Sequence, residues 1–374
     1  MKTFLSLVLL FCFVFGDFEY KVENTNFTIA SKDLTYNYDR LRLRADIFED
    51  DYFATIIADG VNYYGVDYVN SIEFMYLQNL QSDTPFKTQT SFREYENGSV
   101  YAKLYRAYGG YEDSKNRIVV GLQNISMGVG RIWTPTNLFN PRNIYALEPD
   151  ETFGVAALLY TRHINDTSDL SVLVSQKEDE SFKYGARYKA FLEFSDIAFE
   201  VISSDKTKML GFEFEANLAE SGIEIRSELA YMKNELRNAL YEKKETEFTQ
   251  MIIGADYGFV NGVTLIAEAL YSSKNFTSQE IFLNLDSELV QNLVYSKLYT
   301  ALSLSYSFNI FLDGSLTYIE SFNDENSRFI SPTLSYTYND YNSFILGAQI
   351  QDGSSLSEFG SLENRYFFKY TLSF

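Results

Sequence analysis

Apolar and polar residues alternate along most of this chain with a period of two, and the alternation runs to the last residue. Successive side chains of a β-strand point to opposite faces of its sheet, so each such segment has one apolar and one polar face. The pattern recurs over residues 210–218, 298–308 and 344–350. At the C-terminus the apolar face consists of Tyr366, Phe368, Tyr370, Leu372 and Phe374. The alternation predicts an all-β protein built from amphipathic strands.

The character of the two faces distinguishes between two all-β architectures. A soluble β-sandwich would turn a dry apolar face inward. Here the apolar face ends repeatedly in Tyr or Phe, and the other face carries charged, Ser/Thr and Gln/Asn side chains. Short connections such as 195–196 and 339–340 also alternate with long ones such as 234–246 and 274–296. These features are typical of a transmembrane antiparallel β-barrel, which is the fold class we expect, and a secreted sandwich is the alternative.

The number of strands follows from the number of alternating segments. Seventeen such segments lie between residues 35 and 374. Bacterial barrels close with an even number of strands, so we expect an eighteenth strand within residues 18–30 and both chain ends at the rim of the short turns. Sixteen strands is the alternative, if two weak N-terminal segments are loops. Pro332 interrupts one segment, and because proline lacks a main-chain N–H we expect a β-bulge there.

The N-terminus has the layout of an export signal. A short positive start, Met1–Thr3, precedes an apolar run from Phe4 to Phe15, and the small residue Gly16 follows. This order is typical of a cleaved secretory signal peptide. The run is too short to cross ~30 Å of hydrocarbon as a helix. We therefore expect residues 1–16 to be a signal peptide and residues 17–374 to form a single barrel domain.

The composition excludes several classes of function. The chain has 51 acidic and 31 basic residues, a net charge of −20, one cysteine and one histidine. A polyanionic chain does not hold a phosphate backbone by charge, so we expect no nucleic-acid partner. Disulfide frameworks, zinc sites and haem sites lose their usual ligands. The single histidine, His163, precedes a predicted turn without a positioned nucleophile, so we expect no enzyme activity, no metal site and no cofactor.

Two segments resemble those of Gram-negative outer-membrane porins. The alternating C-terminal strand that ends in Phe374 is similar to the signal by which such barrels reach the assembly machinery. The stretch from Gly128 to Pro141 resembles a segment of porin-like families in which a Gly-x-Gly strand end leads into a Pro-x-Asp/Asn-x-Phe-Asn-Pro loop. The resemblance implies a bacterial outer-membrane location. It also implies lipids, lipopolysaccharide, the barrel-assembly machinery and small solutes as partners, and a homotrimer as one arrangement.

Prolines are concentrated in one long connection, residues 125–152, which also holds the only tryptophan. A proline-stiffened connection with little alternation has no lipid-facing role, so we expect it to fold inward and narrow a pore. Porins commonly use such a loop as their constriction, and the resemblance points the same way; packing on the rim is the alternative. The candidate constriction residues are Arg131, Trp133, Asn137, Asn140, Arg142, Glu148, Asp150 and Glu151.

Charged residues on the polar strand faces would line the lumen. Facing rows of opposite charge would orient polar solutes, whereas ion pairs between neighbouring strands are the alternative. The overall excess of acid would concentrate cations at the mouth. The expected lumen charges are Arg42, Arg44, Arg187, Lys189, Glu213, Glu215, Glu224, Arg226 and Glu228.

The connection 274–296 has a different period. Ile281, Leu285, Leu289 and Leu293 recur every four residues, and Ser278 stands where a helix cap would be. This spacing predicts an amphipathic helix in an external loop. Such a helix would form a lid over the pore or would pack against the rim.

Together these features predict an outer-membrane porin through which small polar or ionic solutes diffuse passively, with a slight preference for cations. A substrate-specific channel, with Trp133 and lumen tyrosines guiding the solute, is the alternative within the same class. A closed barrel that acts as a surface scaffold or adhesin is the alternative from another class.

Overall fold

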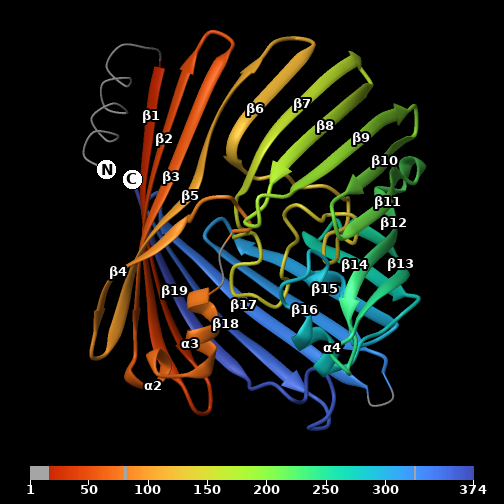
Figure 1. Cartoon of the computed structure of the whole chain (residues 1–374). Coiled ribbons are helices and arrows are strands. Elements are labelled where there is room, and N and C mark those ends of the chain that lie inside the picture. The colour runs from red at the N-terminus through yellow and green to blue at the C-terminus, as the bar shows by residue number, and fades with distance from the viewer. Residues whose placement is uncertain (1–16, 80–81, 324–325) are drawn as a thin grey trace.

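The computed structural model describes residues 17–79, 82–323 and 326–374. The expected signal peptide, residues 1–16, lies outside the described residues. The described strands form one antiparallel sheet, and it closes on itself where the first strand pairs with the last, from Glu23 opposite Ser373 to Ala30 opposite Tyr366 (Figure 1). None of the described helices is long and apolar enough to cross a membrane.

Eighteen strands make the closed ring, which confirms the expected number and the strand expected within residues 18–30. Each pairs with the next in the chain, and a short additional strand, β4 (Gln89–Tyr95), pairs with the lower part of β5. The ring consists of β1 (Asp17–Ala30), β2 (Thr35–Glu49), β3 (Tyr52–Tyr64), β5 (Gly98–Glu112), β6 (Asn116–Gln123), β7 (Val155–Asn165), β8 (Ser168–Gln176), β9 (Phe182–Leu192), β10 (Ser195–Ser203), β11 (Thr207–Asn217), β12 (Ile223–Arg237), β13 (Lys243–Gly258), β14 (Val263–Ser272), β15 (Leu298–Asn309), β16 (Leu312–Ser321), β17 (Ser327–Asn339), β18 (Asn342–Asp352) and β19 (Arg365–Ser373).

The two faces of the sheet have the polarity that the alternation predicts. On β12, Arg226 and Glu228 are buried inside the ring, whereas Leu229 and Tyr231 are 41% and 40% exposed on its outside. The same holds on β15, where Leu302 and Leu304 are exposed. An apolar outer belt around a charged interior reverses the arrangement of a soluble protein, and lipid is the solvent that makes it stable.

The connections differ in length between the two rims. At one rim the strands are joined by turns of a few residues, and the C-terminus lies there, with Phe374 and Val22 exchanging main-chain hydrogen bonds of 2.8 and 3.1 Å. At the other rim lie the long connections, residues 65–97, 124–154, 273–297 and 353–364. This asymmetry is that of outer-membrane barrels, in which the longer loops are external.

The prediction of a β-bulge at Pro332 is wrong. Pro332 lies opposite Leu316 of β16, and its strand keeps one register with β18 on both sides of it, from Ile330 opposite Ile350 to Thr333 opposite Gly347. Pairing with β18 is only interrupted in between. Because proline lacks an N–H, the ladder loses a hydrogen bond, but no residue is inserted and the strand does not shift.

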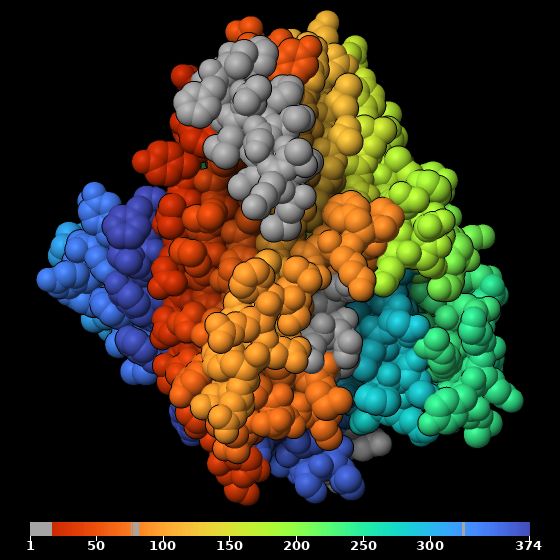
Figure 2. Space-filling view, turned by 60° about the vertical axis from the view of Figure 1, so that its left-hand side comes forward, coloured from red at the N-terminus to blue at the C-terminus, as the bar shows by residue number. Residues whose placement is uncertain are grey.

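The connection between β3 and β5 completes the barrel wall beside the short strand β6. It carries helices α2 (Val66–Val69) and α3 (Ile72–Asn79), whose Tyr68 and Phe74 pack against inward side chains of β3 and β5. β6 pairs with residues 107–112 of β5, and β4 with residues 98–103. In Figure 2 this orange connection reaches the yellow-green strands. A hydrogen bond of 2.8 Å from the Glu178 main-chain N–H to Asp83 Oδ1 joins it to the β8–β9 turn there.

The interior of the ring is filled by its own long connections. Residues 124–154, here called the inner loop, run inside the barrel (Figure 1). Leu138 and Phe139 of this loop lie in a buried cluster with inward side chains of β7, β8 and β10 to β13 and with Leu289 and Leu293 of the 273–297 connection. The core of this protein therefore lies between the barrel wall and the inner loop.

Candidate functional site

One side of the barrel wall holds the inner loop by its main chain. Glu213 on β11 accepts a hydrogen bond from the Gly128 N–H at 2.8 Å. Glu228 on β12 accepts from the N–H groups of residues 129 and 130 at 2.6 and 2.7 Å, and from the N–H and hydroxyl of Thr136 at 3.2 and 3.0 Å. Glu268 on β14 accepts from the N–H groups of residues 131, 132 and 133 at 3.0, 3.2 and 2.7 Å. Such charge-assisted bonds are stronger than bonds between neutral groups, so three carboxylates anchor this end of the inner loop.

The two glycines of the Gly128-x-Gly130 sequence are required by this approach. Gly128 has a φ of +90°, and a Cβ there would stand 2.6 Å from Glu228 Oε1. A Cβ on Gly130 would stand 1.8 Å from the carbonyl oxygen of Trp133. Only glycine lets the main chain approach the Glu228 carboxylate and the Trp133 carbonyl oxygen so closely.

Asn137 and Asn140 lie buried within the inner loop and hold its turns together. Asn140 Oδ1 accepts a hydrogen bond from the Ile125 N–H at 2.6 Å, and its amide donates to the carbonyl oxygen of Phe153. Asn137 donates to the carbonyl oxygen of Asn140 at 2.8 Å. Lys183 of β9 donates to the carbonyl oxygen of Leu138 at 3.1 Å. These side chains set the path of the loop.

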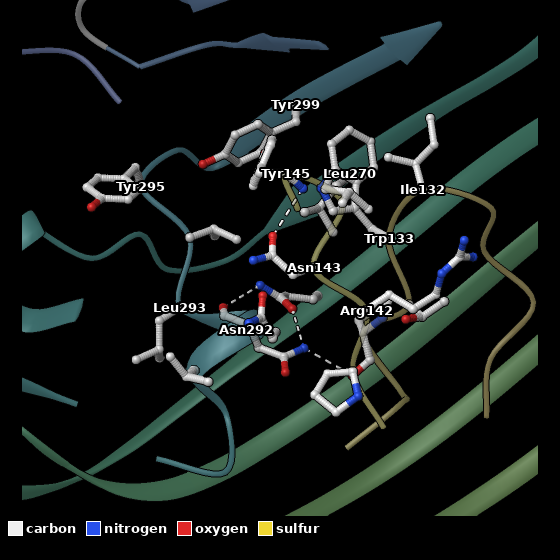
Figure 3. A pocket seen from close by; sticks show the side chains of 18 of the residues that line it. Ile132, Trp133, Arg142, Asn143, Tyr145, Leu270, Asn292, Leu293, Tyr295 and Tyr299 are labelled. Carbon is white, nitrogen blue, oxygen red and sulfur yellow. Dashed lines mark hydrogen bonds between the residues drawn. The ribbon is translucent and has the colours of Figure 1, made fainter. Parts of the chain in front are cut away.

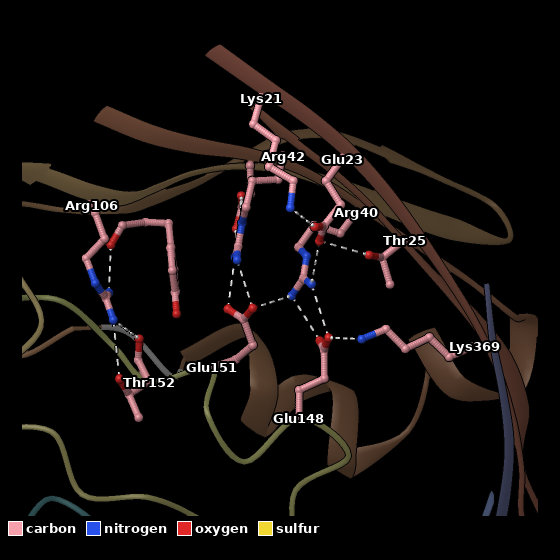
Figure 4. Close-up of polar contacts among 12 residues, drawn as sticks. Lys21, Glu23, Thr25, Arg40, Arg42, Arg106, Glu148, Glu151, Thr152 and Lys369 are labelled. Carbon is pink, nitrogen blue, oxygen red and sulfur yellow. Dashed lines mark hydrogen bonds and ion pairs between the residues drawn. The ribbon is translucent and has the colours of Figure 1, made fainter. Parts of the chain in front are cut away.

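A basic cluster on the opposite side of the wall holds the far end of the loop (Figure 4). Arg40 Nη1 of β2 lies 2.9 Å from Glu148 Oε2, and Lys369 Nζ of β19 lies 2.9 Å from Glu148 Oε1. Arg42 lies 2.7 Å from Asp59 and 2.8 Å from Glu151. Burial alone would raise the pKa of Glu151, but hydrogen bonds from Arg42 and the charge of Arg40 outweigh it and lower this pKa to about 2. Glu151 is therefore ionised throughout the physiological range.

The remaining constriction candidates are Arg131, Trp133, Arg142 and Asp150 of the inner loop. The guanidinium of Arg131, 44% exposed, lies 2.7 Å from Glu224, 3.3 Å from Asp256 and 3.5 Å from Glu215. Arg142 and Asp150 form a 2.7 Å ion pair in which the aspartate is 85% exposed. The indole of Trp133 lies 5.9 Å from the ring of Tyr299.

The other expected lumen charges form ion pairs between strands or along one strand. The distances are 2.9 Å for Arg187–Glu200, 2.9 Å for Lys189–Asp196, 2.6 Å for Arg44–Asp46 and 2.8 Å for Arg226–Glu224. Arg187 also pairs with Glu213, and Arg226 with Asp256. The positive and negative groups thus alternate at close range along this part of the wall.

The helix expected in the 274–296 connection is shorter than predicted. It is α4 (Ser278–Leu283), and its cap is Thr277, which forms a capping box with Glu280, so Ser278 is its first helical residue. The Asn284 side chain ends it by donating to the Arg237 carbonyl oxygen at 2.8 Å. Leu289 and Leu293 pack inside the barrel instead of continuing the helix. Asn292 donates to the carbonyl oxygen of Pro135 at 3.1 Å, which joins this connection to the inner loop.

A cavity of about 130 Å³ lies where three long connections meet. The inner loop contributes Trp133 and Tyr145, the 273–297 connection contributes Tyr295, and the 353–364 connection contributes Glu358. Strand β15 adds Tyr299. Figure 3 shows the tyrosine rings gathered on one side and Asn292 with Arg142 on the other.

Solved structures share this architecture at low sequence identity. OccAB1 of Acinetobacter baumannii matches with a TM-score of 0.64 and 10% identity, over 96% of each chain. The outer membrane protein OpdK of Pseudomonas aeruginosa matches with a TM-score of 0.58 and 10% identity, over 96% of this chain and 99% of OpdK. The fold is that of an outer-membrane porin.

OpdK has also been crystallised with vanillate, and that structure matches this porin fold with a TM-score of 0.56 and 11% identity, over 96% of this chain and 98% of OpdK. No protein-family model and no curated protein matches the sequence. The comparisons thus support the fold, and the site has to be argued from this chain's own residues.

The C-terminal residues expected to form an assembly signal lie on β19, the last strand of the barrel, or directly after it. Tyr366, Phe368 and Phe374 are 55%, 41% and 66% exposed on the lipid-facing side. The hydroxyl of Tyr370 donates to Asn342 Oδ1 of β18 at 2.6 Å. These large outward side chains are the surface that a partner in the membrane would meet.

Several functional residues were missed by the sequence reasoning. Arg40, Lys369 and Glu268 anchor the inner loop, and Glu358 lines the cavity. Arg40 stands two positions before Arg42 and therefore on the same face of its strand, a signal that was present in the sequence. Glu358 lies in a connection without alternation, and no local pattern marks it.

Proposed function

We propose that this protein is an outer-membrane channel for small polar or ionic solutes and that its inner loop forms the constriction. The outer membrane is the location in which a closed barrel with an apolar outer belt is stable. The observation that carries the proposal is the anchoring of the inner loop from both sides of the wall. Glu213, Glu228 and Glu268 hold one end, and Arg40 and Arg42 hold the other.

A loop fixed in this way narrows the lumen permanently. No movable domain is needed to restrict the passage. Solutes would pass between Arg131, which is 44% exposed, and the exposed Asp150. Charges fixed at a narrow point orient and select polar solutes because little water is left there to screen them. The net charge of −20 favours cations at the mouth.

A substrate-specific channel is the second candidate, and the aromatic cavity beside the inner loop favours it. OpdK, a protein of the same fold, has been crystallised with vanillate. For the present chain, a preferred solute would bind at the cavity before passing the constriction. Preferred uptake of one solute class over others of equal size would distinguish this candidate from general diffusion.

Conductance in a planar bilayer tests the proposal. The purified barrel should give stable single-channel currents in KCl, and the reversal potential in a KCl gradient should have the sign of cation preference. Swelling of liposomes in isosmotic sugars of increasing size would report the aperture. Persistent electrical silence of protein that is folded by its heat-modifiable gel mobility would reject the channel and favour the scaffold or adhesin alternative.

A further inference from the structure

A carboxylate that forms no ion pair with any described residue lines the cavity beside the inner loop. Glu358 Oε2 accepts hydrogen bonds from the hydroxyls of Tyr299 and Ser321, each at 2.8 Å. Both bonds from the described residues reach the same oxygen, which leaves Oε1 as an acceptor toward a ligand. Burial is the main influence on this carboxyl and raises its pKa to about 7, and no charged group among the described residues opposes the shift.

The acids that hold the inner loop have either a cationic partner or several main-chain N–H donors, and Glu358 has neither among the described residues. Glu228 and Glu268 accept hydrogen bonds from main-chain N–H groups of the loop. Glu148 and Glu151 each have an arginine within 2.9 Å, and Glu213 has Arg187. Glu358 is a partly buried carboxylate that faces a cavity, accepts from two hydroxyl groups and forms no ion pair with a described residue. A buried charge is costly unless it is paired, so a cation supplied from outside would find a favourable place there.

The walls of the cavity suit an organic cation. Trp133, Tyr145, Tyr295 and Tyr299 line it from three different segments. The faces of aromatic rings attract cations, with tryptophan the strongest. Arg142 also lines the cavity, but it is paired with Asp150 at 2.7 Å and therefore does not neutralise Glu358. A volume of about 130 Å³ is well below the roughly 300–1,000 Å³ of sites for drug-sized ligands, so the ligand is small.

We propose that this cavity, between Trp133, Tyr145, Tyr299 and Glu358, binds the ammonium group of a small organic cation. The ammonium would donate to Glu358 Oε1 while its alkyl part contacts the aromatic rings. This inference rests on the proposed channel function, because it assigns a binding site to solutes that enter from the rim of the long connections.

The single tryptophan of the chain makes the test direct, because Trp133 lies in the wall of the proposed site. Purified protein in detergent is titrated with propylammonium chloride at pH 8 while tryptophan fluorescence is recorded. A saturable change in fluorescence is expected. The affinity for propylammonium should be at least tenfold higher than the affinity for sodium propionate or propanol. Equal responses to propylammonium and propionate would overturn the proposal without any variant.

Two variants identify the carboxylate that is responsible. Glu358→Gln keeps the shape and an acceptor oxygen but removes the charge, and it should weaken propylammonium binding at least tenfold. Glu363→Gln, at an exposed position in the same connection, is the matched control and should bind like the wild type. Undiminished binding by a folded Glu358→Gln variant would reject the site.

The pH dependence gives a second readout. With a pKa of about 7, Glu358 gains its negative charge between pH 6 and pH 8, so propylammonium should bind more weakly at pH 6. The other titratable groups in the wall are one arginine and three tyrosines, whose ordinary pKa values of ~10 and above lie outside this range. Single-channel currents are measured on the same preparation. Currents without ammonium binding reject only the site, whereas absent currents reject the channel function itself.

Discussion

Glu228 Oε1 accepts a hydrogen bond from the main-chain N–H of Gly130 at 2.7 Å, although 98 residues separate the two in the sequence. The carboxylate is wholly buried on the inner face of β12, and the glycine belongs to the inner loop. A wall residue of the barrel thus positions the main chain of the segment that we propose narrows the lumen.

Glu228→Ala should loosen the inner loop without opening the barrel. Three main-chain N–H groups and the Thr136 hydroxyl would lose their acceptor, at a cost of ~1–3 kcal/mol for each donor that stays buried and unpaired. We expect larger and noisier single-channel currents, and faster liposome swelling with larger sugars. Glu235→Ala, at an exposed position of the same strand, is the control. Unchanged currents in Glu228→Ala would show that this contact does not set the aperture.

Gly130→Ala should disturb the same contact by changing the inner loop instead of the wall. The added Cβ would stand 1.8 Å from the Trp133 carbonyl oxygen, so the loop has to shift, at a cost of roughly 1–3 kcal/mol. The expected result is again an increased conductance, together with a changed Trp133 fluorescence maximum. Gly60→Ala is the matched control, because no atom lies within 4 Å of the position of its Cβ. A Gly130→Ala variant with wild-type currents and fluorescence would contradict the packing described.

Glu151→Gln should shift ion selectivity toward anions. It removes a negative charge that lies 2.8 Å from Arg42 and 3.3 Å from Arg40, so two arginines gain influence over the lumen. The reversal potential in a KCl gradient should move by several millivolts in the anion direction. Glu220→Gln, at an exposed position in the turn between β11 and β12 at the opposite rim, is the control and should have a smaller effect. A shift of equal size in Glu220→Gln would show that Glu151 has no special influence on selectivity.

The stability that the ion pairs of Glu151 contribute should persist in mild acid. Its folded-state pKa of about 2 lies below the ordinary value of 4.5, so its ion pairs stabilise the fold above the unfolded pKa and are lost as pH falls through the folded pKa. The contribution of this group should therefore be complete at pH 7, decline below about pH 4.5 and disappear near pH 2. The difference in unfolding midpoint between wild type and Glu151→Gln, measured in urea from pH 7 to pH 3, checks the direction. A difference that grows as the pH falls would refute it.

Removal of the terminal aromatic ring should impair assembly more than stability. Phe374 is 66% exposed, and its ring centroid lies 6.0 Å from that of Tyr341, so Phe374→Ala loses little packing. We expect a severalfold lower amount of heat-modifiable barrel in the outer membrane, with near-normal refolding in detergent. Ser373→Ala is the control. Equal membrane levels of the two variants would argue against recognition of the terminal residue by the assembly machinery.

Much of the barrel follows from the sequence because its signal is local. Alternation assigns each strand and its lipid-facing side, and the even-number rule supplies the strand of residues 17–30. The two predictions of local structure that were wrong also have local causes. Pro332 removes one hydrogen bond without inserting a residue, so no bulge forms. The leucines at 289 and 293 have a helical spacing but pack inside the barrel, and the helix stops at Leu283.

The partners of the charged residues follow from the sequence far less well. Arg42 and Glu151 were both identified as candidates, one for the lumen and one for the constriction, but their contact was not predicted. Asn137 and Asn140 were expected at the aperture and lie buried as supports of the loop. The residue types are compatible with either position, and only the path of the loop distinguishes them.

The sequence by itself determined the class of fold, the strand number and the side of the wall on which each strand residue lies, because these depend on neighbours one or two positions away. Only the tertiary structure decided which charges meet. Arg40 and Glu148 are 108 residues apart, and their contact exists because ring closure places β2 beside the end of the inner loop. The same closure brings Glu358 to the cavity of Trp133 and Tyr299. Contacts of this kind depend on barrel geometry and loop path, for which a single sequence carries no local signal.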